Sequence, residues 1–323
     1  MTPGSRAITQ RGWILFGLMG AIWGVPYLFI KVAVDYLAPP VVVFGRSAIA
    51  AVPLLLFAAR AGAIRPALAH WRPLLAFAAL EMALPWLLLT NAEQHLPSGL
   101  TGLLIACVPI IGAVVAYLLG DRTALRPVRL AGIAIGLAGV GLLVAADLGG
   151  AASGWSIVQV LLVCVGYATA PFIANRRLSH VPDIGVVALS LTGVAIVYTP
   201  VAWLTWPDES PPLRAWGAVL ALAFLCTAIA FVVFFRLIAE VGPARATLIT
   251  FINPAVAVLV GAVVLDEELT GATLVGFALV LAGCWFATRN GPELVPEAPV
   301  VADPPCSSIT PAVDACLRGH RPE

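Results

Sequence analysis

Hydrophobic residues fall into ten long runs, each about 17–25 residues in length and carrying at most one charged side chain. A helix of that length crosses a hydrocarbon layer of about 30 Å. Backbone groups in lipid must be hydrogen-bonded within the chain, and the short alternating segments of a membrane β-barrel are absent from the sequence. We therefore predict an all-α integral membrane protein whose ten transmembrane helices are Gly12–Ile30, Tyr36–Ala59, Pro73–Ala92, Leu96–Gly120, Leu130–Ala146, Ser153–Asn175, Ile184–Pro207, Ala215–Phe235, Ala246–Leu265 and Leu269–Thr288.

Composition agrees with a membrane protein and excludes other classes. Of the 323 residues, 61% are hydrophobic and 11% are charged, whereas roughly a quarter are charged in soluble domains. A net charge of +1 leaves no basic surface for a nucleic acid. The six cysteines follow no metal-binding or disulfide pattern. We accordingly expect no catalytic residues, no metal and no cofactor.

The distribution of positive charge predicts the orientation of the helices. With the N-terminus inside, fifteen of the eighteen Lys and Arg residues lie on inner segments, whereas Lys31 and Arg214 lie on outer ones. One Lys against seventeen Arg, together with abundant Ala, Gly and Pro, indicates a GC-rich bacterial genome. We therefore predict a multi-pass protein of the bacterial cytoplasmic (inner) membrane with both termini in the cytoplasm. Residues 1–11 would form a short cytoplasmic tail, and residues 290–323, rich in Pro and small polar residues, a disordered one.

The two halves of the chain resemble each other at an offset of 145 residues. Pro26 falls on Pro171, and Pro109 falls on Pro254. Each half holds five predicted spans, and because five is odd the second half enters the membrane from the opposite side. Inverted repeats of this kind are an architecture of secondary transporters. The predicted units are a first five-helix repeat at 12–146 and a second, inverted repeat at 153–288.

Three segments carry a family resemblance. They are AIWGVPYLFIKVAVDYLAPPVVVFGR in the first half, LLIACVPIIGAVVAYLLGDR at its end, and LITFINPAVAVLVGAVVLDEELT in the second half. With them the chain resembles the ten-helix EamA-type permeases of the drug/metabolite transporter superfamily, over residues 12–289. The resemblance implies a central cavity and transport of amino acids, sugars, other metabolites or lipid-linked sugars. The connection after Asp121 is two residues longer than its counterpart, so the acidic position of the second half is either Asp266 or Glu267.

Four prolines within the predicted helices are candidate bends. Pro26, Pro109, Pro171 and Pro254 each lack an N–H, so the carbonyl four residues earlier loses its partner. The freed carbonyls could line a polar cavity or mark a hinge for alternating access. Satisfaction by neighbouring side chains is the alternative interpretation.

Two charged residues lie deep within predicted spans. Glu81 is about 12 Å from the inner end of the third helix, where a carboxyl group is costly and usually functional. We expect it to couple protons or to bind a substrate amine, and the alternative is a hydrogen-bonded helix contact. Arg46 lies about 9 Å from the outer end of the second helix, and we assign it as a gate or structural charge. The alternatives are a role in substrate specificity and a side chain that reaches the outer surface. Because helical side chains lean toward their N-terminus, we do not expect a direct Arg46–Glu81 salt bridge.

Aromatic and polar side chains away from the membrane surfaces are candidates for substrate binding. Tyr and Trp offer a flat apolar face and one hydrogen-bond donor, which suit an amphipathic metabolite or a cation. Ordinary helix packing is the alternative for each of them. The predicted substrate-binding residues are Trp23, Tyr27, Trp86, Asn91, Tyr167, Thr250 and Asn253.

Two further motifs are interpreted as structural. The glycine-rich stretch at 132–141 lies within a span, so it is assigned to close helix packing rather than to a phosphate loop. The acidic run at 266–268 is interpreted as a solvated helix end. The sequence contains no Walker A motif, which excludes ATP hydrolysis by this chain as the driving force.

Together these features predict a secondary-active transporter and not an enzyme. It would export a small metabolite, such as an amino acid, through a central cavity by alternating access, with Glu81 as a candidate for proton coupling. The alternative is a flippase for a lipid-linked sugar or related lipid, against which the single deep cation, Arg46, weighs. The expected partners are a small-molecule substrate and the lipid bilayer, with no nucleic acid, and the chain would act as a monomer or a homodimer.

Overall fold

The computed structural model describes residues 9–120, 127–147, 154–241, 246, 249–250 and 252–288. Every regular element in these ranges is a helix, as predicted. The α-helices are α1 (Gln10–Gly24), α2 (Pro26–Val34), α3 (Pro39–Arg60), α4 (Ile64–Ala69), α5 (Trp71–Ala78), α6 (Leu84–Ala92), α7 (Ser98–Ile105), α8 (Val108–Leu118), α9 (Pro127–Asp147), α10 (Gly154–Ile173), α11 (Asp183–Leu204), α12 (Leu213–Ala223), α13 (Ala230–Val241), α15 (Asn253–Val264) and α16 (Gly271–Thr288). Among the described residues, the π-helices η1 (Ala79–Ala83) and η4 (Phe224–Ile229) join consecutive α-helices, and η3 (Ala174–Leu178) continues from the end of α10.

Seven helical stretches in the described residues are long and apolar enough to cross a membrane. They are Gln10–Val34, Pro39–Arg60, Trp71–Ala92, Ser98–Leu118, Gly154–Leu178, Asp183–Leu204 and Leu213–Val241. The other three predicted spans coincide with shorter apolar helices at Pro127–Leu143, Asn253–Val264 and Gly271–Phe286. The structure therefore supports a multi-pass membrane protein, and the count of ten spans stays a prediction.

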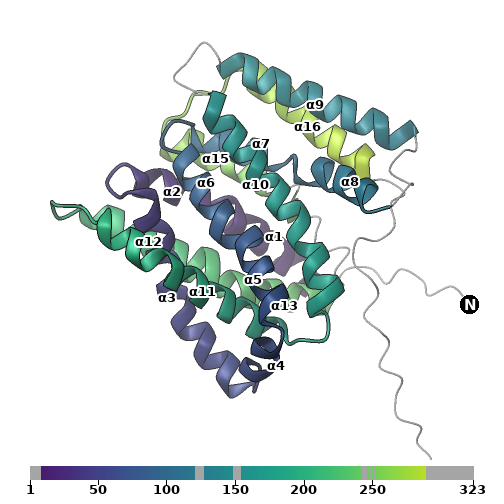
Figure 1. Cartoon of the computed structure of the whole chain (residues 1–323). Helices are drawn as coiled ribbons and strands as arrows, with labels where there is room; N and C mark the ends of the chain where they lie inside the picture. Colours follow the sequence, from purple (N-terminus) through teal and green to yellow (C-terminus); the bar gives the residue numbers. More distant parts are fainter. Residues whose placement is uncertain are drawn as a thin grey trace, which may run out of the picture.

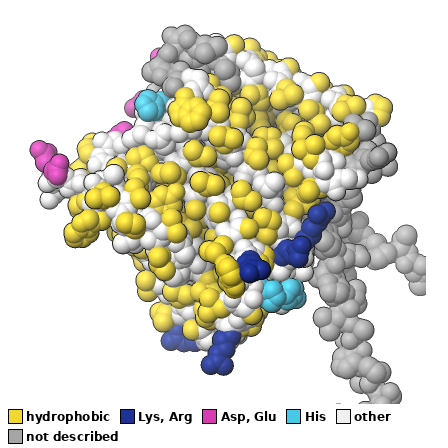
Figure 2. All heavy atoms as spheres, in the orientation of Figure 1, with side chains coloured by type: hydrophobic (Ala, Val, Ile, Leu, Met, Phe, Trp, Pro, Cys, Tyr) yellow, Lys and Arg dark blue, Asp and Glu magenta, His cyan; other side chains and the backbone are white. Residues whose placement is uncertain are grey.

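The described residues expose more large hydrophobic side chains than is usual for a protein surface in water. Large hydrophobic side chains such as Leu213 (86% exposed) and Trp203 (80%) project outward, and Figure 2 shows hydrophobic side chains over most of one face. On this face the Lys and Arg side chains gather toward the lower margin, whereas Asp and Glu side chains lie at the upper left. Such a large apolar band between charged ends fits a lipid-facing surface.

Three of the four predicted proline bends are helix interruptions. α1 ends at Gly24 and α2 begins with Pro26, and α7 and α8 are separated just before Pro109. Pro254 stands in the first turn of α15. Each fits a first-turn position, where the missing N–H leaves no bond unmade. Pro171 differs, because α10 continues through it and the π-helix η3 follows at once.

The two parts of the chain, residues 9–147 and 154–288, pack mainly against each other. α3 lies along α11, α7 along α15, α2 on α12, α6 on α10 and α1 on α13. In the described residues, buried side chains at these contacts form one large apolar core and three smaller ones, each with residues of both parts. The polar groups described below therefore lie at a boundary that relative motion of the two parts would open or close.

The glycine-rich stretch at 132–141 packs one helix onto another, as predicted. It lies on α9, which runs beside α16 along one side of the molecule (Figure 1). A Cβ atom at Gly139 would lie 2.8 Å from the carbonyl oxygen of Gly276. Glycine is needed there because the two backbones approach too closely for a side chain.

Candidate functional site

A buried arginine lies where the two parts of the chain meet. Arg46 of α3 has only 8% of its surface exposed. Its Nε donates to Oγ1 of Thr227 in η4 at 2.9 Å, and its Cζ lies 3.7 Å from the centre of the Trp86 ring on α6. Thr227 in turn donates to the carbonyl oxygen of Leu222 at 2.8 Å. Stacking and hydrogen bonding together fix the guanidinium, and with it a positive charge, between α3, α6 and η4.

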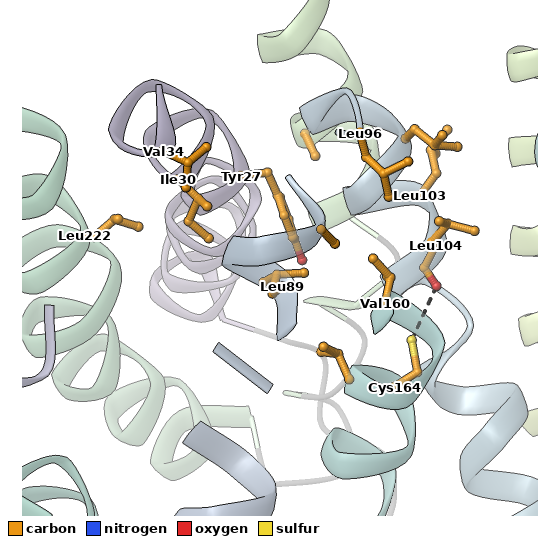
Figure 3. Close-up of a cluster of buried hydrophobic side chains, with 14 of the residues drawn as sticks. Tyr27, Ile30, Val34, Leu89, Leu96, Leu103, Leu104, Val160, Cys164 and Leu222 are labelled. Atoms are coloured by element: carbon orange, nitrogen blue, oxygen red, sulfur yellow. Dashed lines mark hydrogen bonds between the residues drawn. The ribbon is translucent and has the colours of Figure 1, made fainter. Parts of the chain in front are cut away.

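Two tyrosines extend this group through the interior. Tyr167 of α10 is hydrogen-bonded to the Trp86 side chain and interacts electrostatically with Arg46 and Glu81. Tyr27 of α2 is 7% exposed and interacts in the same way with Tyr167 and Arg46. Figure 3 shows the Tyr27 ring pointing from its helix into a set of buried apolar side chains. The group that we call the central cluster consists of Tyr27, Arg46, Glu81, Trp86, Tyr167 and Thr227.

Glu81 lies at the edge of the central cluster, within the single π-helical turn η1. Pro85 has no N–H to donate to the Glu81 carbonyl, and the Leu84 N–H donates to Ala79 O, five residues back. The helix is therefore locally wider around this carboxyl group. Isolated π-turns of this kind are frequent at functional sites.

Arg46 and Glu81 do not form a direct salt bridge, in agreement with the sequence-based expectation. Among the described residues, the ion pair within 4.0 Å joins Arg11 Nε to Glu240 Oε2. Glu81 interacts electrostatically with Tyr167 instead, and its side chain is partly exposed. Tyr167 therefore lies near both Arg46 and Glu81, which do not contact each other as an ion pair.

Trp23 and Asn253 lie in a separate group, where α1 meets the second part of the chain. The Trp23 ring centre is 4.8 Å from that of Phe234 on α13. The Asn253 amide nitrogen, oriented to satisfy both partners, donates to the carbonyl oxygens of Gly20 (3.1 Å) and Ile249 (3.0 Å). These contacts connect the helix break before Pro254 to α1.

The remaining two predicted substrate-binding residues lie on other segments of the chain. Asn91 is partly exposed on α6, near the end of its span, and Thr250 is partly exposed in the short 3₁₀ segment before α15. The structure therefore distributes the seven predicted residues over several places, and brings Tyr27, Trp86 and Tyr167 together.

Sequence reasoning missed a second polar site at the far end of α6. Lys31 Nζ donates to the carbonyl oxygens of Glu93 (2.7 Å) and Leu96 (3.2 Å). The carboxylate of Glu267 accepts from the backbone N–H groups of Ser98 (2.6 Å) and Gly99 (2.8 Å), at the start of α7. We call this arrangement the Glu93 junction, because it connects the two parts of the chain around that residue.

The acidic run at 266–268 is thus not simply a solvated helix end, and that interpretation was wrong for Glu267. Its carboxylate satisfies two first-turn N–H groups of a helix from the other part of the chain, where a negative charge is favoured. A Cβ atom at Gly261 would lie 2.5 Å from Glu267 Oε2, so the carboxylate fills the space that this glycine leaves. Asp266 has a positive φ of 54° and directs the chain into this contact.

Glu93 itself is buried with 0% of its surface exposed. Neither carboxyl oxygen has a hydrogen-bond partner in the described part of the chain. Burial raises the pKa of Glu93, and the nearby Lys31 opposes that shift less strongly. The hydrophobic pattern does not mark Glu93 as buried, because the residue lies between the predicted spans Pro73–Ala92 and Leu96–Gly120.

A third contact joins the two parts at the opposite end of the same span. His180 Nε2 lies 2.9 Å from His70 Nε2, and His70 Nδ1 lies 3.0 Å from Pro66 O. A hydrogen bond between two Nε2 atoms requires that one of them carries no proton. His180 is exposed and His70 is partly exposed, so this contact lies at the surface of the molecule.

The chain is similar in sequence to a family of transporters and to individual proteins named as transporters. A model of the EamA-like transporter family matches residues 10–145 and 154–289. The inner membrane transporter YedA of Escherichia coli, itself uncharacterized, is 31% identical over 298 residues, which cover 89% of this chain and 94% of YedA.

Two further relatives carry names that mention amino acids. A probable terminal-alkyne amino-acid exporter of Streptantibioticus cattleyicolor is 28% identical, covering 88% of this chain and 95% of that protein. A probable amino-acid metabolite efflux pump of Salmonella typhimurium is 24% identical, covering 86% of this chain and 95% of that protein.

One solved crystal structure has a fold similar to that of this chain. It matches with a TM-score of 0.62 at 21% identity, covering 86% of this chain and 96% of that one.

Proposed function

Because the chain belongs to the EamA-like transporter family, we propose that it is a secondary-active exporter of a small metabolite such as an amino acid. The observation that carries this proposal is the central cluster, in which a fixed guanidinium, two tyrosines and a tryptophan meet at the boundary between the two parts. Relatives named for amino-acid export support the substrate class.

The proposed architecture is ten helices arranged as two inverted five-helix repeats in the inner membrane, with both termini in the cytoplasm. The three shorter apolar helices of the described residues would supply the spans beyond the seven long ones. The inner membrane is supported by the relative named for it. The separation of Lys and Arg from Asp and Glu in Figure 2 supports the orientation.

Transport would proceed by motion of the two parts about their shared boundary. The helix interruptions before Pro26, Pro109 and Pro254 supply places where backbone direction can change without loss of helical hydrogen bonds. Arg46 is held by Thr227 and Trp86 from both sides, so we assign it to the gate between the parts. An amphipathic substrate would contact the faces of the central tyrosines.

Glu81 is the proposed proton-coupling group. It is partly exposed, lies in a locally widened helix and neighbours Tyr167, so a proton and a substrate amine would compete for it. In this scheme Glu81→Gln transports without pH dependence or not at all.

The test is a comparison of metabolites inside and outside cells that overproduce the parent protein or Glu81→Gln. A small compound that accumulates in the medium with the parent alone supports export and identifies the substrate. No soluble difference, together with a changed pool of lipid-linked sugar, would refute the proposal in favour of a flippase.

A further inference from the structure

The transport scheme makes no use of Glu93, although its environment is unusual for a carboxyl group. The side chain is fully buried, and both oxygens are without a hydrogen bond in the described residues. An ionised carboxylate is strongly disfavoured in such a place relative to the neutral acid. In the arrangement seen here, Glu93 is therefore held as the neutral acid.

The charges that surround Glu93 are committed to other partners. On α2, the Lys31 amine is engaged by two carbonyl oxygens, one of them that of Glu93 itself. On α3, Arg46 is engaged by the central cluster. Between α15 and α16, the Glu267 carboxylate adds a negative charge nearby, and Tyr27 of α2 faces Glu93 from the interior. In the described residues neither cation donates a hydrogen bond to the Glu93 carboxyl group while the junction keeps this geometry, although both lie near enough to favour its ionised form.

We propose that Glu93 is a proton-binding site that keeps the two parts of the chain closed at the Glu93 junction. With the proton bound, Lys31 clamps the turn that precedes α7, and Glu267 of the other part holds the N–H groups at the start of α7. Loss of the proton to water leaves a carboxylate beside its own backbone carbonyl, where the Lys31 amine already lies.

The negative charge of the ionised Glu93 opens the Glu93 junction through two effects. The amine turns from the carbonyl oxygens of Glu93 and Leu96 to the new carboxylate, so the turn that orients Ser98 and Gly99 loses its clamp. The negative charge also repels Glu267, whose interaction with Glu93 is already unfavourable. Both effects weaken the bonds between Glu267 and α7, which connect the two parts at this end.

The place of this step in transport rests on the proposed function. If the junction faces outward, an external proton binds Glu93 after substrate release and closes the outer side, which resets the exporter. Tyr27 lies near Glu93 and Tyr167, and Tyr167 lies near Glu81, so two buried tyrosines stand between the two carboxyl groups.

Thiol labelling can test the junction without any substrate. Ser98 is 1% exposed with no hydrogen bond on its hydroxyl in the described chain, so Ser98→Cys places a thiol inside the closed junction. The full-length purified protein would also carry Cys306→Ser and Cys316→Ser, because the other four cysteines are buried. Maleimide labelling is measured from pH 5.5 to 8.5 as a ratio to that of a second protein with Glu209→Cys, an exposed position. The ratio removes the rise of reactivity with pH that the two thiols share, and the comparison with Glu93→Gln removes the rest, because that variant carries the same cysteines.

The expected result follows from proton linkage. The closed state binds one more proton than the open state, so it is favoured at low pH and lost as pH rises, by up to about tenfold per pH unit. The labelling ratio should rise with pH in the parent and stay low at every pH in Glu93→Gln, which is permanently neutral. Glu268→Gln, which removes an exposed carboxylate close by, should keep the parent's pH dependence.

Two results would overturn the proposal: a flat ratio in the parent, or the same pH dependence in Glu93→Gln as in the parent. Failure of the proposed function is seen separately, because labelling needs no transported compound. A pH-dependent junction in a protein that moves no metabolite would leave the proton site standing and refute export alone.

Discussion

The contact of Glu267 with the start of α7 makes a sharp prediction about stability. Its two oxygens accept backbone N–H bonds of 2.6 and 2.8 Å across the boundary between the two parts. A hydrogen bond to a charged group contributes roughly 1.5–3 kcal/mol, and the two here share one side chain. We therefore expect Glu267→Ala to lower the free energy of unfolding by about 2–4 kcal/mol. Glu267→Gln, which keeps one acceptor oxygen, should cost about half as much.

The assay is thermal unfolding of the purified full-length protein in detergent, at one pH and one scan rate. A fluorogenic thiol reagent reports unfolding, because Cys107, Cys164, Cys226 and Cys284 are buried in the folded chain. At roughly 2 °C per kcal/mol for a chain of this size, Glu267→Ala should lower Tm by about 4–8 °C.

Glu268→Gln is the matched control, since it makes the same charge change at an exposed neighbour. It should change stability by less than about 0.5 kcal/mol. Equal Tm values for Glu267→Gln and Glu268→Gln would refute the argument that Glu267 connects the two parts.

Three further predictions concern other contacts between the parts. Gly139→Ala forces a Cβ to 2.8 Å from a backbone oxygen of α16 and should lower Tm in the same assay, whereas Gly141→Ala, with nothing within 4 Å, should not; equal values would contradict the packing. Arg46→Lys loses the flat guanidinium that stacks and bonds at once, so export should fall at least about tenfold at unchanged protein level, and full activity would disprove the gate. His180→Ala removes the hydrogen bond to His70 that joins the two parts, a loss of roughly 1 kcal/mol, and should lower Tm in the same assay by about 2 °C; an unchanged Tm would count against the pair.

Much of the fold could be predicted because the signals are local. Apolar runs of membrane length, the proline positions and the glycine-rich stretch each act within one helix, and the family resemblance drawn from them is confirmed by the match over both parts. Arg46 and Glu81 stood out in the same way, because a charge inside an apolar run is rare. Their aromatic partners were named individually from the sequence, but not as one cluster.

The Glu93 junction could not be predicted, because it depends on contacts between distant segments. Glu267 and Ser98 are 169 positions apart, and nothing near either residue marks the other as its partner. Glu93 stands at the boundary of a hydrophobic run, where sequence patterns do not distinguish a solvated side chain from a buried one. The π-turn around Glu81 was missed for a related reason, since it changes the hydrogen-bond register of a helix without changing its periodicity in the sequence.

The central claim, secondary-active export, is tested most directly in liposomes that contain the purified protein. Vesicles loaded with a panel of labelled amino acids are diluted into buffers that impose a pH gradient, and efflux is followed for the parent, Glu81→Gln and empty vesicles. The account predicts efflux of at least one compound that the gradient accelerates in the parent, with no acceleration in Glu81→Gln. The account would be contradicted if efflux of every compound equalled that of empty vesicles, with the pH gradient imposed in either direction.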